Sequence, residues 1–151
     1  MPGMVIADVL TVRPCPTLRP WTSVDEAIRV MRDFGYSELP VLRGRYLDCV
    51  VTEGDLAAAL LDPRDPTEIC VGELVPEHCV VGRRELPLVE ALMLLVRHRL
   101  QRLAVVGDGD EFLGMVSSVD VSTPLEHSRL QEVTATALAT HGGERRLRLI
   151  A

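Results

Sequence analysis

The chain repeats itself once with a period of 64 to 65 residues, and this repeat constrains its fold more than any other feature of the sequence. Each copy has four apolar residues spaced i, i+3, i+4 and i+7, which is typical of one face of a helix: Val24, Ala27, Ile28 and Met31 in the first copy, and Leu88, Ala91, Leu92 and Leu95 in the second. Ser23 and Glu26 have the spacing of a capping box before the first helix, and Pro87 stands where the second helix would begin.

Each predicted helix is followed by two short apolar runs separated by a turn. The runs are residues 39–42 and 46–51 in the first copy and residues 103–106 and 111–116 in the second. The second turn is one residue longer, so the displacement rises from 64 to 65 after it. The lead-ins 6–9 and 71–74 repeat as well. This order predicts an α/β (α+β) fold of two tandem β-α-β-β-α repeats, packed about a pseudo-twofold axis because neither copy alone buries much core.

The expected organisation is a first repeat over residues 1–62, a linker over 63–68, a second repeat over 69–123, and a C-terminal helix and tail over 124–151. The linker prediction rests on the proline and aspartate content of residues 62–66. Pro124 should shorten or kink a helix that starts near Asp120. An apolar stripe from Leu130 to Leu138 predicts an extra helix without a counterpart in the first copy.

Composition argues against several classes of function. The net charge is −6, the chain has no lysine, and no basic stripe is present, which argues against nucleic-acid binding. No apolar run approaches the roughly 20 residues that cross a bilayer, and the first eight residues do not resemble a signal peptide. We therefore expect no membrane association and a cytoplasmic location.

No residue pattern typical of an enzyme or a metal site stands out. The four cysteines have no zinc-site spacing, and Cys49 and Cys70 are expected to be small buried hydrophobic residues. The four histidines form no ligand motif, and residues 108–111 are interpreted as a hairpin turn rather than a calcium loop. We therefore expect a protein without catalytic residues, resident metal or required cofactor.

The ordered motifs resemble the CBS domain, the repeat named after cystathionine β-synthase. The resemblance rests on Ala27, Leu39-Pro40-Val41, Gly44 and Thr52-Glu53-Gly54-Asp55 in the first copy, and on Ala91, Leu103-Ala104-Val105, Gly114-Met115-Val116 and Ser117-Ser118-Val119-Asp120 in the second. It covers roughly residues 5–121. Cys49 and Ala104 depart from the family, which usually has glycine and proline at these positions.

The resemblance implies a CBS pair, or Bateman module, that binds an adenosine-containing ligand in the cleft between the repeats and regulates a protein partner. It also implies a homodimer. The ligand would be an adenine nucleotide such as AMP or ATP, or S-adenosylmethionine. The ligand-binding residues implied are Thr17, Tyr36, Ser37, Pro40, Thr52, Asp55, Gln101, Arg102, Met115, Ser117 and Asp120.

The Thr52–Asp55 and Ser117–Asp120 pairs have two interpretations. A carboxylate at this position can accept hydrogen bonds from a ribose diol, and the hydroxyl suits a phosphate. The same spacing is that of a capping box, in which both side chains serve their own helix. Both roles can hold together.

The residues immediately before the predicted strands 39–42 and 103–106 differ in charge. Arg102 could pair with a phosphate, although it could equally be a surface arginine. Glu38, in the equivalent place, would repel phosphate and favour adenosine, a monophosphate or a thioether. Tyr36 could stack on a purine or pack in the core. Because Pro124 also interrupts the last helix of the second copy alone, we expect two sites of unequal affinity, or one inactive site.

Three functions follow from these observations. The first is a regulatory ligand sensor, the second a ligand-free dimerisation or assembly domain, and the third, ranked last, an enzyme of unfamiliar chemistry. Ligand-dependent melting separates the first from the second.

Overall fold

The computed structural model describes residues 3–11, 14–74, 79–125 and 144–147. It divides the chain into two compact units. The first-repeat unit comprises Pro14–Cys79 with Leu147–Ala151, and the second-repeat unit comprises Val80–Arg146 with Met1–Arg13. Both units are mixtures of helix and strand, so the predicted fold class of two tandem α/β repeats is confirmed.

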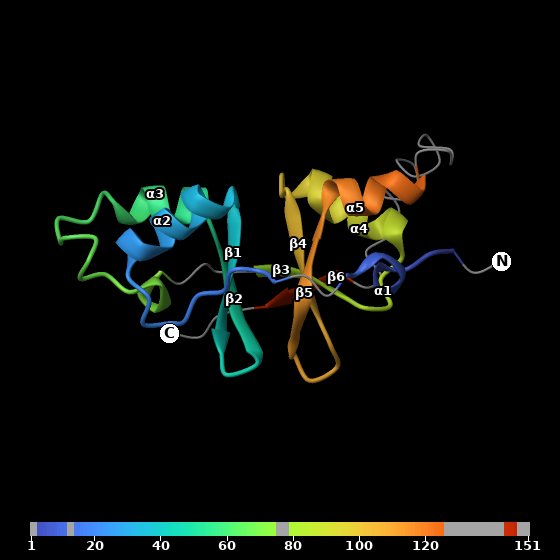
Figure 1. Cartoon of the computed structure of the whole chain (residues 1–151), viewed down its shortest axis with the longest axis horizontal. Coiled ribbons are helices and arrows are strands. Elements are labelled where there is room, and N and C mark those ends of the chain that lie inside the picture. The colour runs from blue at the N-terminus through green and yellow to red at the C-terminus, as the bar shows by residue number, and fades with distance from the viewer. Residues whose placement is uncertain (1–2, 12–13, 75–78, 126–143, 148–151) are drawn as a thin grey trace. The chain divides into compact units, whose positions relative to one another are not determined.

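The first-repeat unit is a β-hairpin packed against two helices (Figure 1). Its elements are α2 (Val24–Phe34), β1 (Glu38–Arg43), β2 (Tyr46–Thr52), α3 (Glu53–Ala59) and the short 3-10 helix η1 (Val71–Glu73). The two strands are antiparallel, with Leu39 opposite Val51 and Val41 opposite Cys49. These four side chains are at most 1% exposed and join Val24, Ala27 and Leu56 of the helices in one core.

Ser23 and Gly35 set the two ends of helix α2. The Ser23 hydroxyl accepts a hydrogen bond from the amide of Glu26 (3.1 Å), which satisfies one free donor of the first turn. Gly35 ends the helix in the left-handed conformation (φ +69°), which residues with a Cβ rarely adopt. The apolar spacing places Val24, Ala27 and Met31 in the core as predicted.

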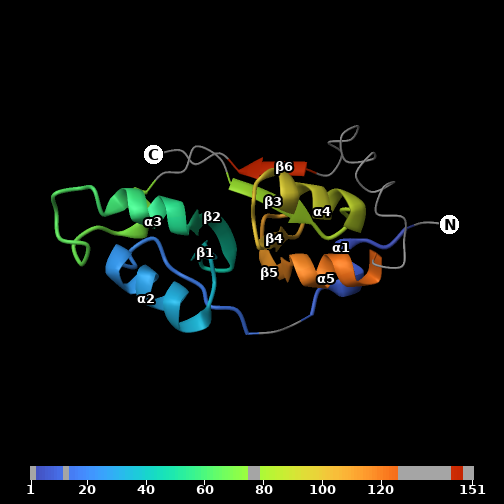
Figure 2. The same ribbon diagram turned by 90° about the horizontal axis from the view of Figure 1, so that it is seen from above.

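The second-repeat unit repeats the order helix, strand, strand, helix and has further elements around it. Its elements are α1 (Ile6–Val9), β3 (Cys79–Arg83), α4 (Leu88–Arg97), β4 (Arg102–Val106), β5 (Phe112–Ser117), α5 (Ser118–Ser122), the 3-10 helix η2 (Thr123–Leu125) and β6 (Glu144–Leu147). The sheet order is β5-β4-β3-β6, and Figure 2 shows β6 beside β3. The sequence did not predict β6. Pro87, which the sequence predicts at the first position of helix α4, is its N-cap, one residue earlier.

The short first strand predicted for each repeat forms in both, but to different extents. In the second-repeat unit it is β3, which runs parallel to β4 with Gly82 opposite Val105. In the first-repeat unit it is reduced to one bridge, in which Leu18 lies opposite Val41. The Leu18 amide donates to the Pro40 carbonyl (2.8 Å), and the Leu18 carbonyl accepts from the Leu42 amide (2.8 Å).

The lead-in of each repeat packs on the other repeat. The Ile6 amide, from the start of the chain, donates to the carbonyl of Leu86 (2.9 Å), and Ile6 is fully buried in the core of the second-repeat unit. In the same way, the Val71 amide donates to the carbonyl of Thr22 (2.7 Å) in the first-repeat unit. The compact units are therefore not continuous stretches of chain.

The two repeats differ at their C-terminal ends. Helix α3 has seven residues, whereas α5 has five and continues as a 3-10 turn that contains Pro124. The prediction that Pro124 shortens this helix is confirmed, since proline disrupts the α-helical hydrogen-bond ladder. The helix predicted around Leu130–Leu138 lies outside the described residues.

Candidate functional site

The first candidate half-site is the junction where β2 ends and α3 begins. The Thr52 amide donates to Oδ2 of Asp55 (2.8 Å), and the Asp55 amide donates to Oγ1 of Thr52 (3.2 Å). This reciprocal pair is a capping box, so the capping interpretation of the motif is confirmed. Both side chains are half-buried.

The second candidate half-site, between β5 and α5, has the same hydrogen bonds. The Ser117 amide donates to Oδ2 of Asp120 (2.9 Å), and the Asp120 amide donates to Oγ of Ser117 (3.1 Å). Within the described part of the chain, the cap engages only Oδ2 of Asp55 and of Asp120. Each Oδ1 can therefore accept a hydrogen bond from a ligand without breaking the cap.

In each repeat, a backbone hydrogen bond holds the residue that precedes the first hairpin strand against the junction. The Ser37 carbonyl accepts from the Glu53 amide (3.1 Å), and the Gln101 carbonyl accepts from the Ser118 amide (2.9 Å). Strand pairing then places Glu38 opposite Thr52, and Arg102 opposite Ser117. The predicted residues Ser37, Thr52 and Asp55 therefore lie together in one unit, and Gln101, Arg102, Ser117 and Asp120 lie together in the other.

The remaining predicted residues lie along the strands or beside them. Pro40 is buried opposite Val50, and Met115 is half-buried opposite Ala104, so each lies two positions from its junction. Thr17 is exposed and precedes Leu18, the residue of the single bridge to β1. Tyr36 is half-buried and packs against the core of the first-repeat unit, as its core-packing interpretation predicts.

Glu38 belongs with the first junction, although the predicted list of ligand-binding residues omits it. Glu38 is only 3% exposed, and its Oε2 accepts a hydrogen bond from the Ser37 hydroxyl at 2.6 Å. The repeat places Glu38 and Arg102 at equivalent positions, opposite Thr52 and Ser117 respectively. The two half-sites therefore carry opposite charges at the same place, a signal available from the 64-residue displacement alone.

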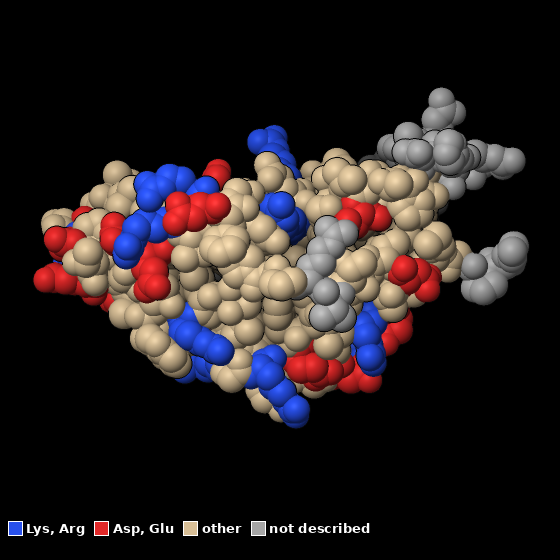
Figure 3. Space-filling model, in the orientation of Figure 1, with Lys and Arg blue, Asp and Glu red and all other residues tan. Residues whose placement is uncertain are grey.

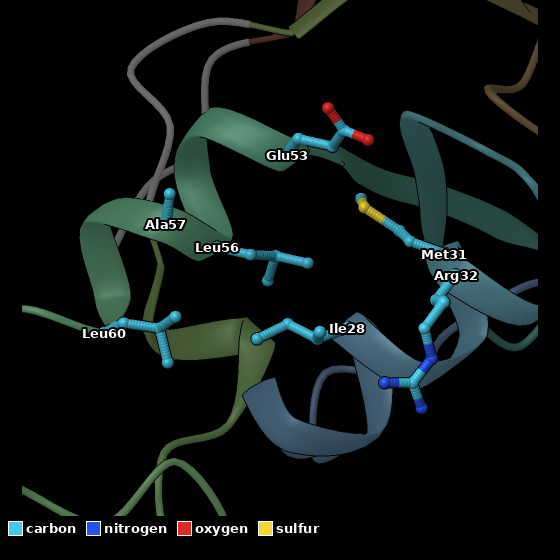
Figure 4. Close-up of a pocket in the computed structure, with 7 residues that line it drawn as sticks. All are labelled: Ile28, Met31, Arg32, Glu53, Leu56, Ala57 and Leu60. Atoms are coloured by element: carbon cyan, nitrogen blue, oxygen red, sulfur yellow. The ribbon is translucent and has the colours of Figure 1, made fainter.

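An apolar groove lies elsewhere in the first-repeat unit, between α2 and α3 (Figure 4). It has a volume of about 400 Å³ and is lined by Ile28, Met31, Arg32, Glu53, Leu56, Ala57 and Leu60. Ile28 and Leu56 face each other across it, and its two charged residues, Arg32 and Glu53, come from different helices.

Charged side chains of both signs are distributed over the face shown in Figure 3. Among the described residues, no group of three or more histidine, cysteine, aspartate or glutamate side chains is arranged to hold a metal ion. None of the described helices combines the length and the hydropathy needed to span a bilayer.

Comparison with known sequences gives a consistent result. The sequence model of the CBS domain matches residues 6–62 and 71–126. Inosine-5'-monophosphate dehydrogenase of Korarchaeum cryptofilum is 32% identical over 119 residues, which are 79% of this chain but 23% of that enzyme. The chain thus spans about a quarter of the length of this relative.

Two solved structures have the same fold. The crystal structure of CBSX2 of Arabidopsis thaliana in complex with AMP is 27% identical, with a TM-score of 0.69 over 84% of this chain and 100% of that one. The CBS pair of protein MJ0100, in complex with 5-methylthioadenosine and S-adenosylmethionine, is 20% identical, with a TM-score of 0.67 over 85% and 100% of the two chains.

Proposed function

The chain belongs to the CBS domain family, and on this basis we propose that it is a non-enzymatic regulatory CBS pair that binds an adenosine-containing ligand of the AMP, ATP or S-adenosylmethionine type. The observation that carries the proposal is the duplicated junction, in which Asp55 and Asp120 are held by the same hydrogen bonds in both units. The complex of CBSX2 with AMP supports an adenine nucleotide as the ligand class.

The junction can bind ribose because the cap fixes the carboxylate before a ligand arrives. The Oδ2 hydrogen bonds hold Asp55 and Asp120 in one orientation, so Oδ1 is preorganised to accept a hydrogen bond from a ribose hydroxyl. Hydrogen bonds to an ionised carboxylate are stronger than those between neutral groups. At each half-site, one aspartate side chain can therefore orient the ribose of a bound nucleoside.

Opposite charges beside the two junctions favour different ligands. Arg102, opposite Ser117, can form two parallel hydrogen bonds to a phosphate through its planar guanidinium group. Glu38, opposite Thr52, repels a phosphate and tolerates a neutral or cationic group, such as a nucleoside or a sulfonium. We propose that AMP and ATP bind at the Asp120 half-site in preference to the Asp55 half-site.

We expect AMP to stabilise the protein and the Asp120→Asn variant to lose most of that effect. A ligand that binds only the folded state, at a hundred times its dissociation constant, adds about 2.7 kcal/mol, or about 5–10 °C in the thermal midpoint of a chain of this size. Melting curves with adenosine, AMP, ADP, ATP and S-adenosylmethionine measure the shift. Asparagine keeps an acceptor for the Ser117 amide, so the cap survives while the charge is lost.

Glu73→Gln is the control for this experiment. Glu73 accepts from the Cys70 amide (2.8 Å) in the same capping pattern, but it caps η1 and is not part of either junction. It should lower the midpoint slightly and leave the ligand-induced shift intact. No shift with any of the five compounds would contradict ligand binding and favour the assembly function. A shift lost in Asp55→Asn but kept in Asp120→Asn would reverse the assignment of the half-sites.

We also propose that the protein forms a homodimer through the α2–α3 groove and acts in the cytoplasm on a protein partner whose conformational equilibrium the ligand shifts. The groove supports self-association because its walls are apolar and its two charges are opposite. In a twofold dimer, Arg32 of each copy can pair with Glu53 of the other. The equivalent positions in the second repeat are Val96 and Ser118, which cannot form this pair.

Leu60→Glu is expected to convert such a dimer to monomer, with at least a tenfold rise in its dissociation constant. Leu60 lines the groove and is 50% exposed, so the charge should cost little in the monomer but would be desolvated in the dimer. Light scattering coupled to gel filtration measures the mass. Leu61→Glu is the matched control, since Leu61 is 86% exposed and outside the groove. Equal effects of both variants, or a wild-type monomer, would contradict dimerisation through this groove.

A further inference from the structure

Two buried thiols lie in the core of the first-repeat unit, one on β2 and the other beside that strand. Cys49, on β2, is 1% exposed, and Cys79, the first residue of β3, is 3% exposed; both belong to the first-repeat unit. Cys49 is also the residue that departs from the family's usual glycine, which its counterpart Gly114 retains. The pair is therefore a feature of this chain's own sequence.

Two contacts with the backbone of Val50 hold the Cys79 thiol in place. The Val50 amide donates to Sγ of Cys79 at 3.1 Å, and that thiol lies 3.7 Å from the Val50 carbonyl, which accepts from it. Because β1 pairs with the other side of β2, Cys79 takes the place of a neighbouring strand at this edge. The Cys79 sulfur therefore lies beside the residue that follows Cys49, and both cysteines belong to the same buried core.

The two thiols have different acidities. The hydrogen bonds from Cys49 and from the Val50 amide lower the pKa of the Cys79 thiol. The hydrogen bond to Cys79, followed by burial, raises the pKa of the Cys49 thiol. Cys79 is therefore the thiol that ionises more readily and the first nucleophile of the pair, whereas Cys49 keeps its proton.

We propose that Cys49 and Cys79 are a modification site, at which a small disulfide oxidant converts the two buried thiols into an intramolecular disulfide. The Cys79 thiolate attacks one sulfur of the oxidant and expels one thiolate, forming a mixed disulfide. Cys49 sulfur then attacks Cys79 sulfur, expels the second thiolate and passes its proton to it. Two protein thiols and one small disulfide thus become one protein disulfide and two small thiols.

The half-exposed cysteines, Cys15 and Cys70, supply the comparison. The Cys15 thiol donates to the carbonyl of its neighbour Pro16 (3.5 Å), and Cys70 lies at the start of η1. Exposure alone would make these two react first. We expect Cys49 and Cys79 to be selected instead because they lie close together in one core, so that a mixed disulfide on either can be resolved by the other.

The test is to incubate the native protein with cystamine for several hours and then count thiols in denaturant. The expected result is a fall from four thiols to two and a Cys49–Cys79 crosslinked peptide in a non-reducing digest. The thermal midpoint should rise by about 5 °C or more, since the bond closes a loop of about 30 residues. Reduction with dithiothreitol should reverse each change.

Variants make the assignment specific. The Cys15→Ser, Cys70→Ser double variant should still lose both remaining thiols, whereas Cys49→Ala should form no intramolecular disulfide. Four thiols in native protein, under conditions that oxidise the urea-unfolded chain, would overturn the proposal. A Cys15–Cys70 crosslink, or cystamine adducts confined to those two residues, would overturn it as well. The peptide map of the wild-type chain decides the matter even if Cys49→Ala does not fold.

Discussion

Replacing Ile6 by alanine is expected to lower the free energy of unfolding by about 2–5 kcal/mol, the usual cost of truncating a large buried aliphatic side chain. Ile6 lies near the start of the chain and by sequence belongs to the first repeat. Its side chain is nevertheless fully buried in the core of the second-repeat unit, next to Leu86 and Leu103. Loss of its side chain leaves a cavity there that the neighbouring strands cannot close.

Urea denaturation with two probes measures this effect. Met4→Ala is the control, because Met4 precedes the same helix but is 44% exposed and should change stability by less than about 1 kcal/mol. If Ile6→Ala were no more harmful than Met4→Ala, the lead-in would not be part of the second-repeat core in solution.

Gly72→Val should lower the free energy of unfolding by about 1–3 kcal/mol, the range found for overpacked sites. A Cβ at Gly72 would lie 2.7 Å from the carbonyl oxygen of Pro20 and 3.1 Å from its Cβ. The Gly72 amide donates to that same carbonyl at 2.8 Å, so the lead-in cannot retreat without losing the hydrogen bond. The nearest atom to the added Cβ belongs to the backbone of Pro20, which moves less easily than the end of a flexible side chain.

Gly54→Ala provides the contrast for this variant. Gly54 lies in the first turn of α3, where an added Cβ would meet only Oγ1 of Thr52, at an ordinary 3.6 Å. Alanine there should be neutral or stabilise by up to about 1 kcal/mol, since it reduces the conformational freedom of the unfolded chain. Equal midpoints for the Gly72→Val and wild-type proteins in urea would contradict the close approach of lead-in and loop.

Local patterns predicted most of the secondary structure. The spacing of Val24, Ala27 and Met31 identified a helix because it places these side chains on one face, and Ser23 marked its start. The rise in the repeat displacement from 64 to 65 residues predicted that the second hairpin has one residue more than the first. Pro124 predicted the short α5 because proline acts on its own helix.

Partners distant in the sequence could not be predicted in this way. The local sequence pattern around Ile6 is that of an amphipathic turn, but it does not predict that the Ile6 amide donates to the carbonyl of Leu86. Cys70, expected to be buried, is half-exposed because it caps η1, whereas Cys79, for which no burial was predicted, is enclosed beside Val50. Burial at these positions depends on tertiary contacts that neither spacing nor composition contains.

For the candidate site, the sequence predicted the residues but could not separate their two roles. Thr52 and Asp55 form the capping box that their spacing implies, and the same geometry leaves an oxygen that suits a ribose hydroxyl. A cap and a ligand site require the same residue types at the same spacing. Only a binding measurement distinguishes them.

The exchange of lead-ins also has a consequence for how such a chain arises. One repeat on its own has a core that lacks a segment, and it carries a segment that fits only another copy's core. Two separate repeats would complete each other by reciprocal domain swapping, at a rate and yield that depend on their concentration. Joining two copies in one chain makes this exchange intramolecular, since the tether fixes a high effective concentration. In a chain that carries both repeats, a step that would otherwise be assembly becomes a step of folding.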